Sequence, residues 1–508
     1  MDRYYTNNKY TVRNERGIKL LPVLILFGFV FLSGLIFLIL TTDNFEFLER
    51  PYLLPWVILA AVVFVIPGIY LGYKNKFQLY HPLVFPVLFY FLPSFFVGGI
   101  ILMLGLNEPY FMSFVQDQEY NLPLTMVIVI LGFAGLTAGF FIPIGGKVGQ
   151  IISRFLPDWK WDDDNVIFPG LFLLILGFLN NILGFFVGVI GYQKIEETGS
   201  YDGLIFLTTL LWIQGSFMLW VALFRRNRWN FKALAIVALL VATSLLKAVF
   251  AGNRGGLLQI FILILLSYVF AGRIIKLKQA VVLGVAMVVV VIVGMIYGTT
   301  FRQVKGSEEQ IESSRYVENI SKTFDTIGEK GPGKILEQSF FSLSERLEAV
   351  SSLAVVVSNY EQLKPYEESY GIDNNIYKDT VTFIVPRIFW KDKPVASEPR
   401  RYSELYFNYG ENSFTITPMG DLVRNFGVVG VPLGMLLLGF IVRILYAALI
   451  ENQPFSYWRS VLFFMLVPSI SYESFYGSII PYMFKVGFIT VVGIVMTQFL
   501  INKVSRKV

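Results

Sequence analysis

Apolar runs of roughly 20 residues recur along the whole chain, and each run is long enough to cross a hydrocarbon core about 30 Å thick. The chain has 508 residues, of which 55% are hydrophobic and only 15% are charged, whereas soluble proteins carry about 25% charged residues. These features predict an all-α polytopic membrane protein with about twelve transmembrane helices. The predicted spans lie near residues 20–40, 53–72, 83–106, 122–144, 166–190, 204–224, 233–250, 257–271, 280–299, 427–447, 459–471 and 484–501.

The first apolar run follows a basic N-terminus, MDRYYTNNKYTVRNERGIKL. It is longer than the core of a signal peptide, and no small-residue cleavage site follows it. We therefore expect this run to be retained as the first membrane span.

The loops between the predicted spans fall into two alternating sets. One set is basic and includes the N-terminus, RRNRWNFK at 225–232, GRIIKLK at 272–278 and the C-terminal KVSRKV. The other set is acidic or neutral, as in TTDNFEFLER at 41–50 and QKIEETGSYDG at 193–203. Because basic loops tend to stay on the cytoplasmic side, we expect both termini to be cytoplasmic.

This orientation places a long segment outside, between the ninth and tenth spans. The chain divides into a membrane domain with spans one to nine (1–300), an extracytoplasmic loop domain (301–426) and a second membrane part with spans ten to twelve (427–508). In the outer segment, apolar residues recur at helical spacing over 333–357, which predicts one amphipathic helix. Residues 361–420 are rich in Tyr, Pro, Asn and Gly and are expected to be irregular, and irregular backbone on a rigid scaffold often carries function.

Several cations are predicted to lie at the outer membrane boundary. Arg254 occurs in the glycine-rich turn AGNRGG, where the backbone can approach a ligand closely. A second group stands in TFIVPRIFWKDKP at 382–394, which is too charged to be a membrane span. Arginine matches phosphate oxygens bidentately and lysine adds a point charge, so such cations suit an anionic lipid-linked substrate such as a polyprenyl diphosphate. The set comprises Lys247, Arg254, Arg302, Arg387, Lys391, Lys393, Arg400, Arg401 and Arg424, beside aromatic residues that include Trp390.

Other interpretations of these residues remain open. Arginine at the end of a span commonly snorkels to lipid headgroups, and interfacial aromatic residues commonly form a belt. The single histidine, His81, is expected to be structural, and the absence of cysteine excludes a zinc site built on several His or Cys ligands. We expect Asn180 and Asn181 to bond between helices, and the acidic run at 162–164 to be solvated.

Three stretches together resemble the Wzy-type O-antigen or oligosaccharide repeat-unit polymerases. They are AGNRGG after a span, YGIDNNIYKDTVTFIVPRIFWKDKP in the outer segment, and TPMGDLVRNFGVVGVPLGMLLLGF leading into the next span. Two further arginines, Arg302 and Arg346, also stand where such proteins tend to have arginine. The motifs cover residues 250–440, and the first half of the chain is similar only in its hydrophobic pattern.

The resemblance implies a glycosyltransferase of polysaccharide biosynthesis in the cell envelope, with a GT-C-like fold in the inner (cytoplasmic) membrane. Such O-antigen polymerases of lipopolysaccharide assembly transfer a growing glycan from undecaprenyl diphosphate onto a new lipid-linked repeat unit at the outer face. Membrane lipid, a chain-length regulator and a flippase are the implied partners. No nucleic acid, metal or other cofactor is implied.

Individual roles follow from this expected reaction. Cations must stabilise the diphosphate as it leaves, and Arg254, Arg302 and Arg387 are the first candidates for that catalytic role. The remaining predicted contacts to substrate are Lys247, Arg346, Trp390, Lys391, Lys393, Arg400, Arg401 and Arg424.

A carboxylate could accept the proton of the acceptor hydroxyl. Glu404 and Asp421 are the catalytic candidates, beside Glu398 and Glu473, and the sequence does not rank them. Asp421 could equally cap the tenth span or pair with Arg424.

Other functions also stay open. An O-antigen-ligase-like enzyme is expected to carry a functional histidine in its large outer loop, and residues 301–426 contain none. A transferase that uses a polyprenyl-phosphate sugar is a close alternative. A flippase or transporter of lipid-linked oligosaccharide needs ionisable residues near the bilayer midplane, whereas the charges here concentrate in the outer segment. A non-enzymatic assembly or sensing protein is the last alternative.

Overall fold

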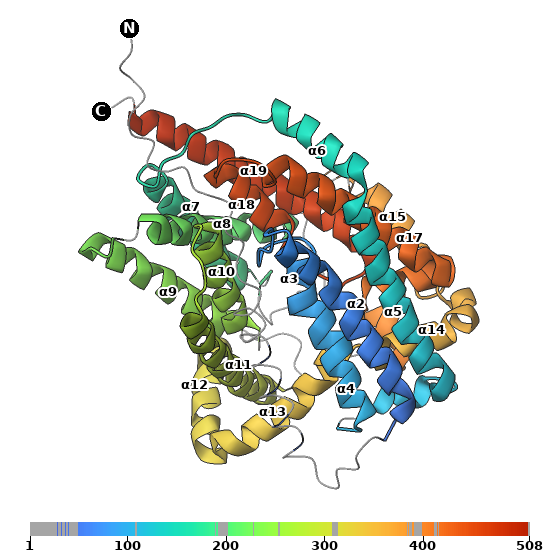
Figure 1. The fold of residues 1–508 in the computed structure, drawn as a ribbon. Helices are drawn as coiled ribbons and strands as arrows, with labels where there is room; N and C mark the ends of the chain where they lie inside the picture. The colour runs from blue at the N-terminus through green and yellow to red at the C-terminus, as the bar shows by residue number, and fades with distance from the viewer. Residues whose placement is uncertain are drawn as a thin grey trace.

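The computed structural model describes residues 49–106, 109–187, 189–190, 202–226, 228–251, 255–306, 313–383, 385, 389–390, 399–410, 414 and 416–505, together with the single positions 28, 32, 36 and 39. Over these residues the chain is all-helical and contains no strand. The long helices pack side by side, and α12 (Ser313–Lys330) and α13 (Pro332–Leu347) lie at one end of the bundle (Figure 1).

Among the described residues, nine helices are long and apolar enough to cross a membrane. The structure thereby confirms a helical membrane protein. One of the nine is composite, made of α3 (Val84–Pro86), η2 (Val87–Val97) and α4 (Gly98–Met103), and η2 is a π-helix. The others are α2 (Leu54–Tyr73), extended by η1 (Pro51–Leu53), α5 (Gln118–Phe141), α7 (Ile167–Phe186), α8 (Asp202–Arg226), α9 (Phe231–Ala251), α11 (Leu277–Lys305), α17 (Pro418–Leu449) and α19 (Tyr476–Ser505).

Two of the predicted spans form helices that are short for a complete crossing. α10 (Gly256–Phe270) has 15 residues and α18 (Tyr457–Leu466) has 10, which correspond to about 22 Å and about 15 Å of helix. Of the predicted first span, 20–40, only four isolated helical positions are among the described residues. The count of twelve spans therefore stays a prediction.

Loops of the predicted basic set meet on one face of the bundle, which we call the basic face. Arg225 donates from Nε to Asp163 Oδ1 over 2.9 Å, and Arg226 pairs with Asp164. In the same region the guanidinium of Arg273 donates to a backbone carbonyl at the end of α8. Asp163 and Asp164 of the acidic run are therefore ion-paired, and the expectation that the run is only solvated is wrong for these two residues.

Loops of the acidic or neutral set contact the predicted outer segment at the opposite face. The Tyr110 hydroxyl donates to the Phe407 carbonyl over 3.1 Å. Gln116 Nε2 donates to Asn359 Oδ1 over 2.9 Å. The loop around 107–120 and the outer segment thus lie together, as the grouping of the loops predicts.

The outer segment is more helical than the sequence suggests, because part of the 361–420 region predicted to be irregular forms short helices. Its described elements are α12, α13, α14 (Val350–Leu363), η4 (Lys364–Tyr366), α15 (Asn375–Thr382) and α16 (Pro399–Phe407).

The single helix predicted over 333–357 is broken at Glu348, between α13 and α14. Close packing against the membrane domain explains the break. The Ala349 N–H donates to the Ser94 carbonyl of the π-helix over 3.2 Å. A Cβ at Gly98 would lie only 2.8 Å from Glu348 Cα, so the two backbones are in direct contact.

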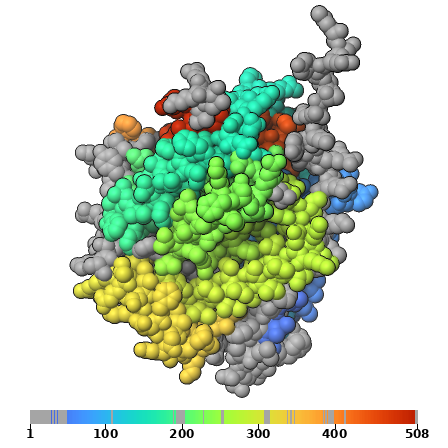
Figure 2. Space-filling model, turned by 90° about the vertical axis from the view of Figure 1, so that its left-hand side faces the viewer, coloured from blue at the N-terminus to red at the C-terminus, as the bar shows by residue number. Residues whose placement is uncertain are grey.

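The face shown in Figure 2 includes teal helices above and green to yellow helices below, and among the latter α10 packs on α9 and α11 while α11 contacts α12 and α13. Large apolar side chains of α9 and α11 are exposed, including Leu245 of α9 and Val282 and Val289 of α11. Extended exposed apolar surface marks contact with a membrane or a partner, so these two helices are suited to face lipid.

α5 and α17 run parallel and touch through their backbones (Figure 1). A Cβ added at Gly135 would lie 2.4 Å from the Pro432 carbonyl oxygen, and one added at Gly139 would lie 2.0 Å from that of Leu436. On the α17 side, Gly439 is equally close to the α5 backbone. Small residues allow helices to approach in this way within membranes. The contact continues into α6 (Pro143–Phe155), which packs on the second half of α17.

Gly139→Ala is expected to lower the free energy of unfolding by about 1–3 kcal/mol, the usual range for overpacking, because the new methyl group would overlap the Leu436 carbonyl. The thermal unfolding midpoint of the purified protein in detergent checks this. Gly203→Ala is the control, since nothing lies within 4 Å of that glycine's added Cβ. Equal midpoints for the two variants would contradict the close contact.

Candidate functional site

α17 consists of two helical pieces, because Gly427 adopts φ +69° and ψ −174° within it. A positive φ of this kind favours glycine. Thr417 caps the first piece by accepting the Gly420 N–H over 3.0 Å. The predicted tenth span, 427–447, starts at the break, so residues 418–426 form a short helical piece ahead of it.

This first piece carries a buried arginine between two carboxylates. Arg424 is 1% exposed, its Nη1 lies 3.2 Å from Glu367 Oε1, and its Nη2 lies 3.2 Å from Asp421 Oδ1. Asp421 and Glu367 are buried as well. Burial raises the pKa of Glu367, and the nearby guanidinium of Arg424 opposes that shift. A buried charge without such partners would cost several kcal/mol.

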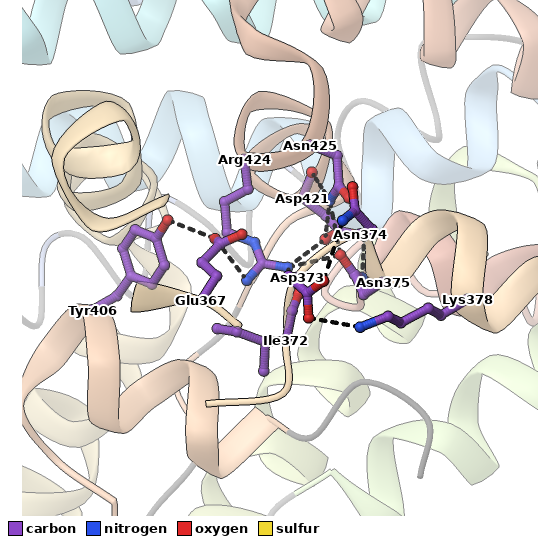
Figure 3. A network of polar contacts seen from close by, with 10 residues as sticks. All are labelled: Glu367, Ile372, Asp373, Asn374, Asn375, Lys378, Tyr406, Asp421, Arg424 and Asn425. Carbon is purple, nitrogen blue, oxygen red and sulfur yellow. Dashed lines mark hydrogen bonds and ion pairs between the residues drawn. The ribbon is translucent and has the colours of Figure 1, made fainter. Parts of the chain in front are cut away.

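Amide groups complete the arrangement (Figure 3). Arg424 Nη2 donates to Asn375 Oδ1 over 2.8 Å, and Asn375 Nδ2 donates to Asp421 Oδ2 over 3.1 Å. Asn425 Nδ2 donates to Asn375 Oδ1 over 2.8 Å. From α19, the Gly477 N–H donates to Asp421 Oδ2 over 3.1 Å. We call Glu367, Asn375, Asp421, Arg424 and Asn425 the buried network.

Aromatic residues of α16 close the other side of the guanidinium. The Tyr406 hydroxyl donates to Glu367 Oε1 over 2.9 Å. The Arg424 guanidinium carbon lies 5.5 Å from the ring centroid of Tyr402 and 5.7 Å from that of Phe475, within the range of cation–π attraction. Burial raises the pKa of Tyr402 and of Tyr406 well above the ordinary range, so both hydroxyls stay protonated.

The buried network therefore anchors two helices that flank the basic stretch. α15 begins at Asn375, whose side chain belongs to the network, and α16 contributes Tyr402 and Tyr406 around it. Residues 383–398 connect these two helices. Both ends of this connection, which contains most of TFIVPRIFWKDKP, are thus fastened to α17.

Two predicted site residues, Asp421 and Arg424, are brought together in this network. Neither side chain is exposed, and the Asp421 carboxylate already accepts bonds from Asn375 and Gly477. Of the two alternatives for Asp421, the structure shows pairing with Arg424, while Thr417 provides the cap. In this structure both side chains are buried and help to hold the outer segment on α17. Their predicted roles, Asp421 as the base and Arg424 as a contact to substrate, stay predictions.

The other predicted residues are spread over several elements. Glu404 is exposed on α16, one turn or less from the buried tyrosines. Arg302 is half-buried in the last turn of α11. Arg401 is exposed and donates to the Tyr370 carbonyl over 3.4 Å. Arg400 is half-buried and Trp390 is exposed. Outside the described residues lie Arg254, Arg387, Lys391, Lys393, Glu398 and the side chain of Arg346.

Lys247 and Asn181, two of the polar residues considered in the sequence, lie within candidate spans. Lys247 is half-buried in α9, and its Nζ lies 4.3 Å from the ring centroid of Trp212 in α8. Ionisable residues inside a membrane are functional candidates by default, so Lys247 remains one. Asn181 donates to the Thr209 carbonyl over 3.4 Å, which confirms the expected bond between helices for this residue.

His81 is enclosed on the basic face, where its Nδ1 accepts the Leu83 N–H over 3.2 Å. Burial, together with the positive charges of Arg443 and Lys76, lowers the pKa of His81 to about 3. The imidazole is therefore neutral at pH 7, which supports the structural role predicted for it.

The sequence interpretation missed Glu367 and Asn375, although both are central to the buried network. Asn375 stands in YGIDNN, within the stretch that carries the family resemblance, and this was the only signal for it. Glu367 follows the Lys-Pro-Tyr turn of η4 and had no distinguishing pattern.

Another buried carboxylate, Glu348, lies outside the buried network at the break between α13 and α14 and is 2% exposed. Its Oε1 accepts the Ser351 N–H over 2.8 Å, and its Oε2 accepts the Ser351 hydroxyl. Burial raises the pKa of Glu348 to about 7; the bonds from Ser351 and the more remote charge of Arg50 oppose the shift.

A family profile, Domain of unknown function (DUF8712), matches residues 179–458, which is just over half of the chain. The chain belongs to this family. The match runs from α7 into α18 and includes the outer segment with the whole buried network. No curated protein and no solved structure matches the chain.

Arg424→Ala is expected to destabilise the protein by about 3–5 kcal/mol, because it leaves two buried carboxylates without their cation. Lys378→Ala is the control, since Lys378 pairs with Asp373 over 2.6 Å at a partly exposed position, and such pairs contribute about 1 kcal/mol or less. Thermal unfolding in detergent measures both. A loss for Arg424→Ala as small as that for Lys378→Ala would contradict the assigned role.

Glu348→Gln is expected to remove a pH-dependent loss of stability. Between an unfolded pKa of 4.5 and a folded pKa of about 7, the unfolded chain ionises this carboxyl while the folded chain keeps it neutral. Stability therefore falls as the pH rises through that window, by about 3 kcal/mol in all, and the loss is complete above pH 7.

The measurement is the difference in unfolding midpoint between Glu348→Gln and wild type from pH 4.5 to 8.5. The difference should shift in favour of the variant as the pH rises. Glu368→Gln, at an exposed position, should show no such trend. A flat difference for Glu348→Gln would refute the raised pKa.

Proposed function

We propose that this protein is a polysaccharide polymerase that transfers a growing glycan from undecaprenyl diphosphate onto a new lipid-linked repeat unit. In this proposal the enzyme works at the outer face of the cytoplasmic membrane and has a GT-C-like fold with about twelve spans. Both termini are cytoplasmic, and the opposite face described above is the outer one.

The anchoring of the basic segment carries the proposal. Residues 383–398 contain Arg387, Lys391 and Lys393, and the helices at both ends of the segment are fixed to α17 by the buried network. Catalysis of diphosphate departure needs cations that are positioned before the reaction begins. The buried network holds the two helices that flank this segment, α15 and α16, on α17, and this supports such preorganisation.

The roles divide between buried and exposed groups. Arg387, with Lys391 and Lys393, stabilises the leaving diphosphate, and Arg254 and Arg302 assist from the ends of the membrane helices. Glu404 is the carboxylate best suited to accept a proton, because it is exposed on the helix that follows the basic segment.

The test is to incubate the purified protein with its lipid-diphosphate repeat unit and to separate the glycans on a gel. Wild type should give a ladder of repeats. Arg387→Ala and Arg254→Ala should each reduce the rate by about 10²-fold or more, as expected when one donor to a developing anion is removed.

Lys322→Ala is the matched control, because Lys322 forms an exposed pair with Glu318 on α12 and should leave the ladder unchanged. Thermal unfolding confirms that each variant is folded. The absence of a ladder from wild type with its authentic substrate would overturn the polymerase proposal and favour a flipping assay next.

A further inference from the structure

α19 carries an exposed cation, Lys485, that the sequence interpretation did not select. The opposite side of α19 is packed into the membrane domain, where Gln214 of α8 donates to the Thr490 carbonyl over 3.3 Å. Lys485 instead shares its side of the helix with Phe484 and Phe488, which are 55% and 60% exposed. Within the described part of the chain, no carboxylate pairs with Lys485.

The position of Lys485 along α19 fixes its depth. The next charged residue in this helix is Lys503 near the C-terminal end, and residues 486–502 between them carry no charge. At about 1.5 Å per residue the two lysines are about 27 Å apart, which is close to the thickness of a hydrocarbon core of about 30 Å. Lys485 therefore lies at the boundary between hydrocarbon and headgroups, on the side of the buried network.

α15 runs along α19 and ends beside Lys485. At its start, Ile376 lies against Gly477, where an added Cβ would be 2.8 Å from Ile376 Cα. Just beyond its end, the ring centroid of Phe383 lies 5.2 Å from that of Phe484. The basic segment 383–398 thus begins at Phe383, close to Phe484 and to the level of Lys485 along α19.

Exposed apolar side chains on the same elements agree with this depth. Tyr377 and Val381 of α15 are 72% and 52% exposed, and Phe389 in the basic segment is 82% exposed. Aromatic and aliphatic groups at this density are unfavourable in water but are stabilised at a membrane boundary. The surface beside Lys485 therefore combines an unpaired cation with apolar groups that suit a lipid chain.

We propose that Lys485 binds the diphosphate of the lipid-linked substrate as the lipid approaches laterally from the bilayer along α19. The isoprenoid chain packs on Phe484 and Phe488, which are exposed on the same side of α19. This inference rests on the proposed function. A diphosphate carries more negative charge than the phosphodiester of a common phospholipid, so neighbouring cations favour it over bulk lipid.

The test compares wild type with Lys485→Gln, Lys485→Arg and Lys503→Gln. Binding of undecaprenyl diphosphate to the full-length protein in nanodiscs is measured directly, with phosphatidylglycerol as competitor, and repeat-unit transfer is measured on gels. Loss of a charge-assisted bond is expected to weaken binding about tenfold or more and to raise KM for the lipid substrate with little change in kcat. Lys485→Arg should restore both, and Lys503→Gln, at the other end of α19, should behave as wild type.

The outcomes separate the two proposals. Unchanged binding and KM in Lys485→Gln, with a normal ladder from wild type, would overturn the role of Lys485 and leave the polymerase proposal intact. A wild type that neither binds the diphosphate nor gives a ladder would overturn both. Equal competition by phosphatidylglycerol would show a general site for anionic headgroups and would overturn the assignment to substrate.

Discussion

The guanidinium of Arg424 has no exposed surface, so its positive charge must be balanced by groups inside the protein. The packing of the surrounding helices depends on this requirement. The partners of Arg424 come from the start of α17, the turn after η4, α15 and α16, while α19 contributes a backbone N–H to Asp421. None of these contacts can form unless the outer segment folds back onto the membrane helices. The outer segment is therefore part of one folding unit with α17 and α19.

Hydropathy was sufficient to find the nine long apolar helices among the described residues, because the bilayer demands apolar runs of fixed length. The charge of the loops divided them into a basic and an acidic or neutral set. The contact of Arg225 with Asp163 joins two loops of the basic side, and the contact of Tyr110 with Phe407 joins an acidic or neutral loop to the outer segment. The predicted bounds of the eighth and eleventh spans, 257–271 and 459–471, are themselves short, and the corresponding helices α10 and α18 are short in the structure.

The candidate site was less accessible to sequence reasoning. Asp421 and Arg424 looked like surface charges near the end of a span, and only their long-range partners, Glu367 and Asn375, reveal that they are buried. Pairing between residues that are far apart along the chain leaves no periodic signal. The break at Glu348 was hidden for a similar reason, because it depends on contact with Gly98 and Ser94 of another helix.

The glycine contact between α5 and α17 has a mechanical consequence. The carbonyls of Pro432 and Leu436 in α17 lie directly against Gly135 and Gly139 of α5. Neither helix can slide or rotate past the other without a steric clash, so the two helices move as one rigid unit. α15 and α16 are held on α17 by the buried network around Arg424, so they are restrained together with this rigid unit. Relative motion of the helices must then occur elsewhere in the bundle, for example at α9 to α11, for which no packing against α5 or α17 is seen in the described part of the chain.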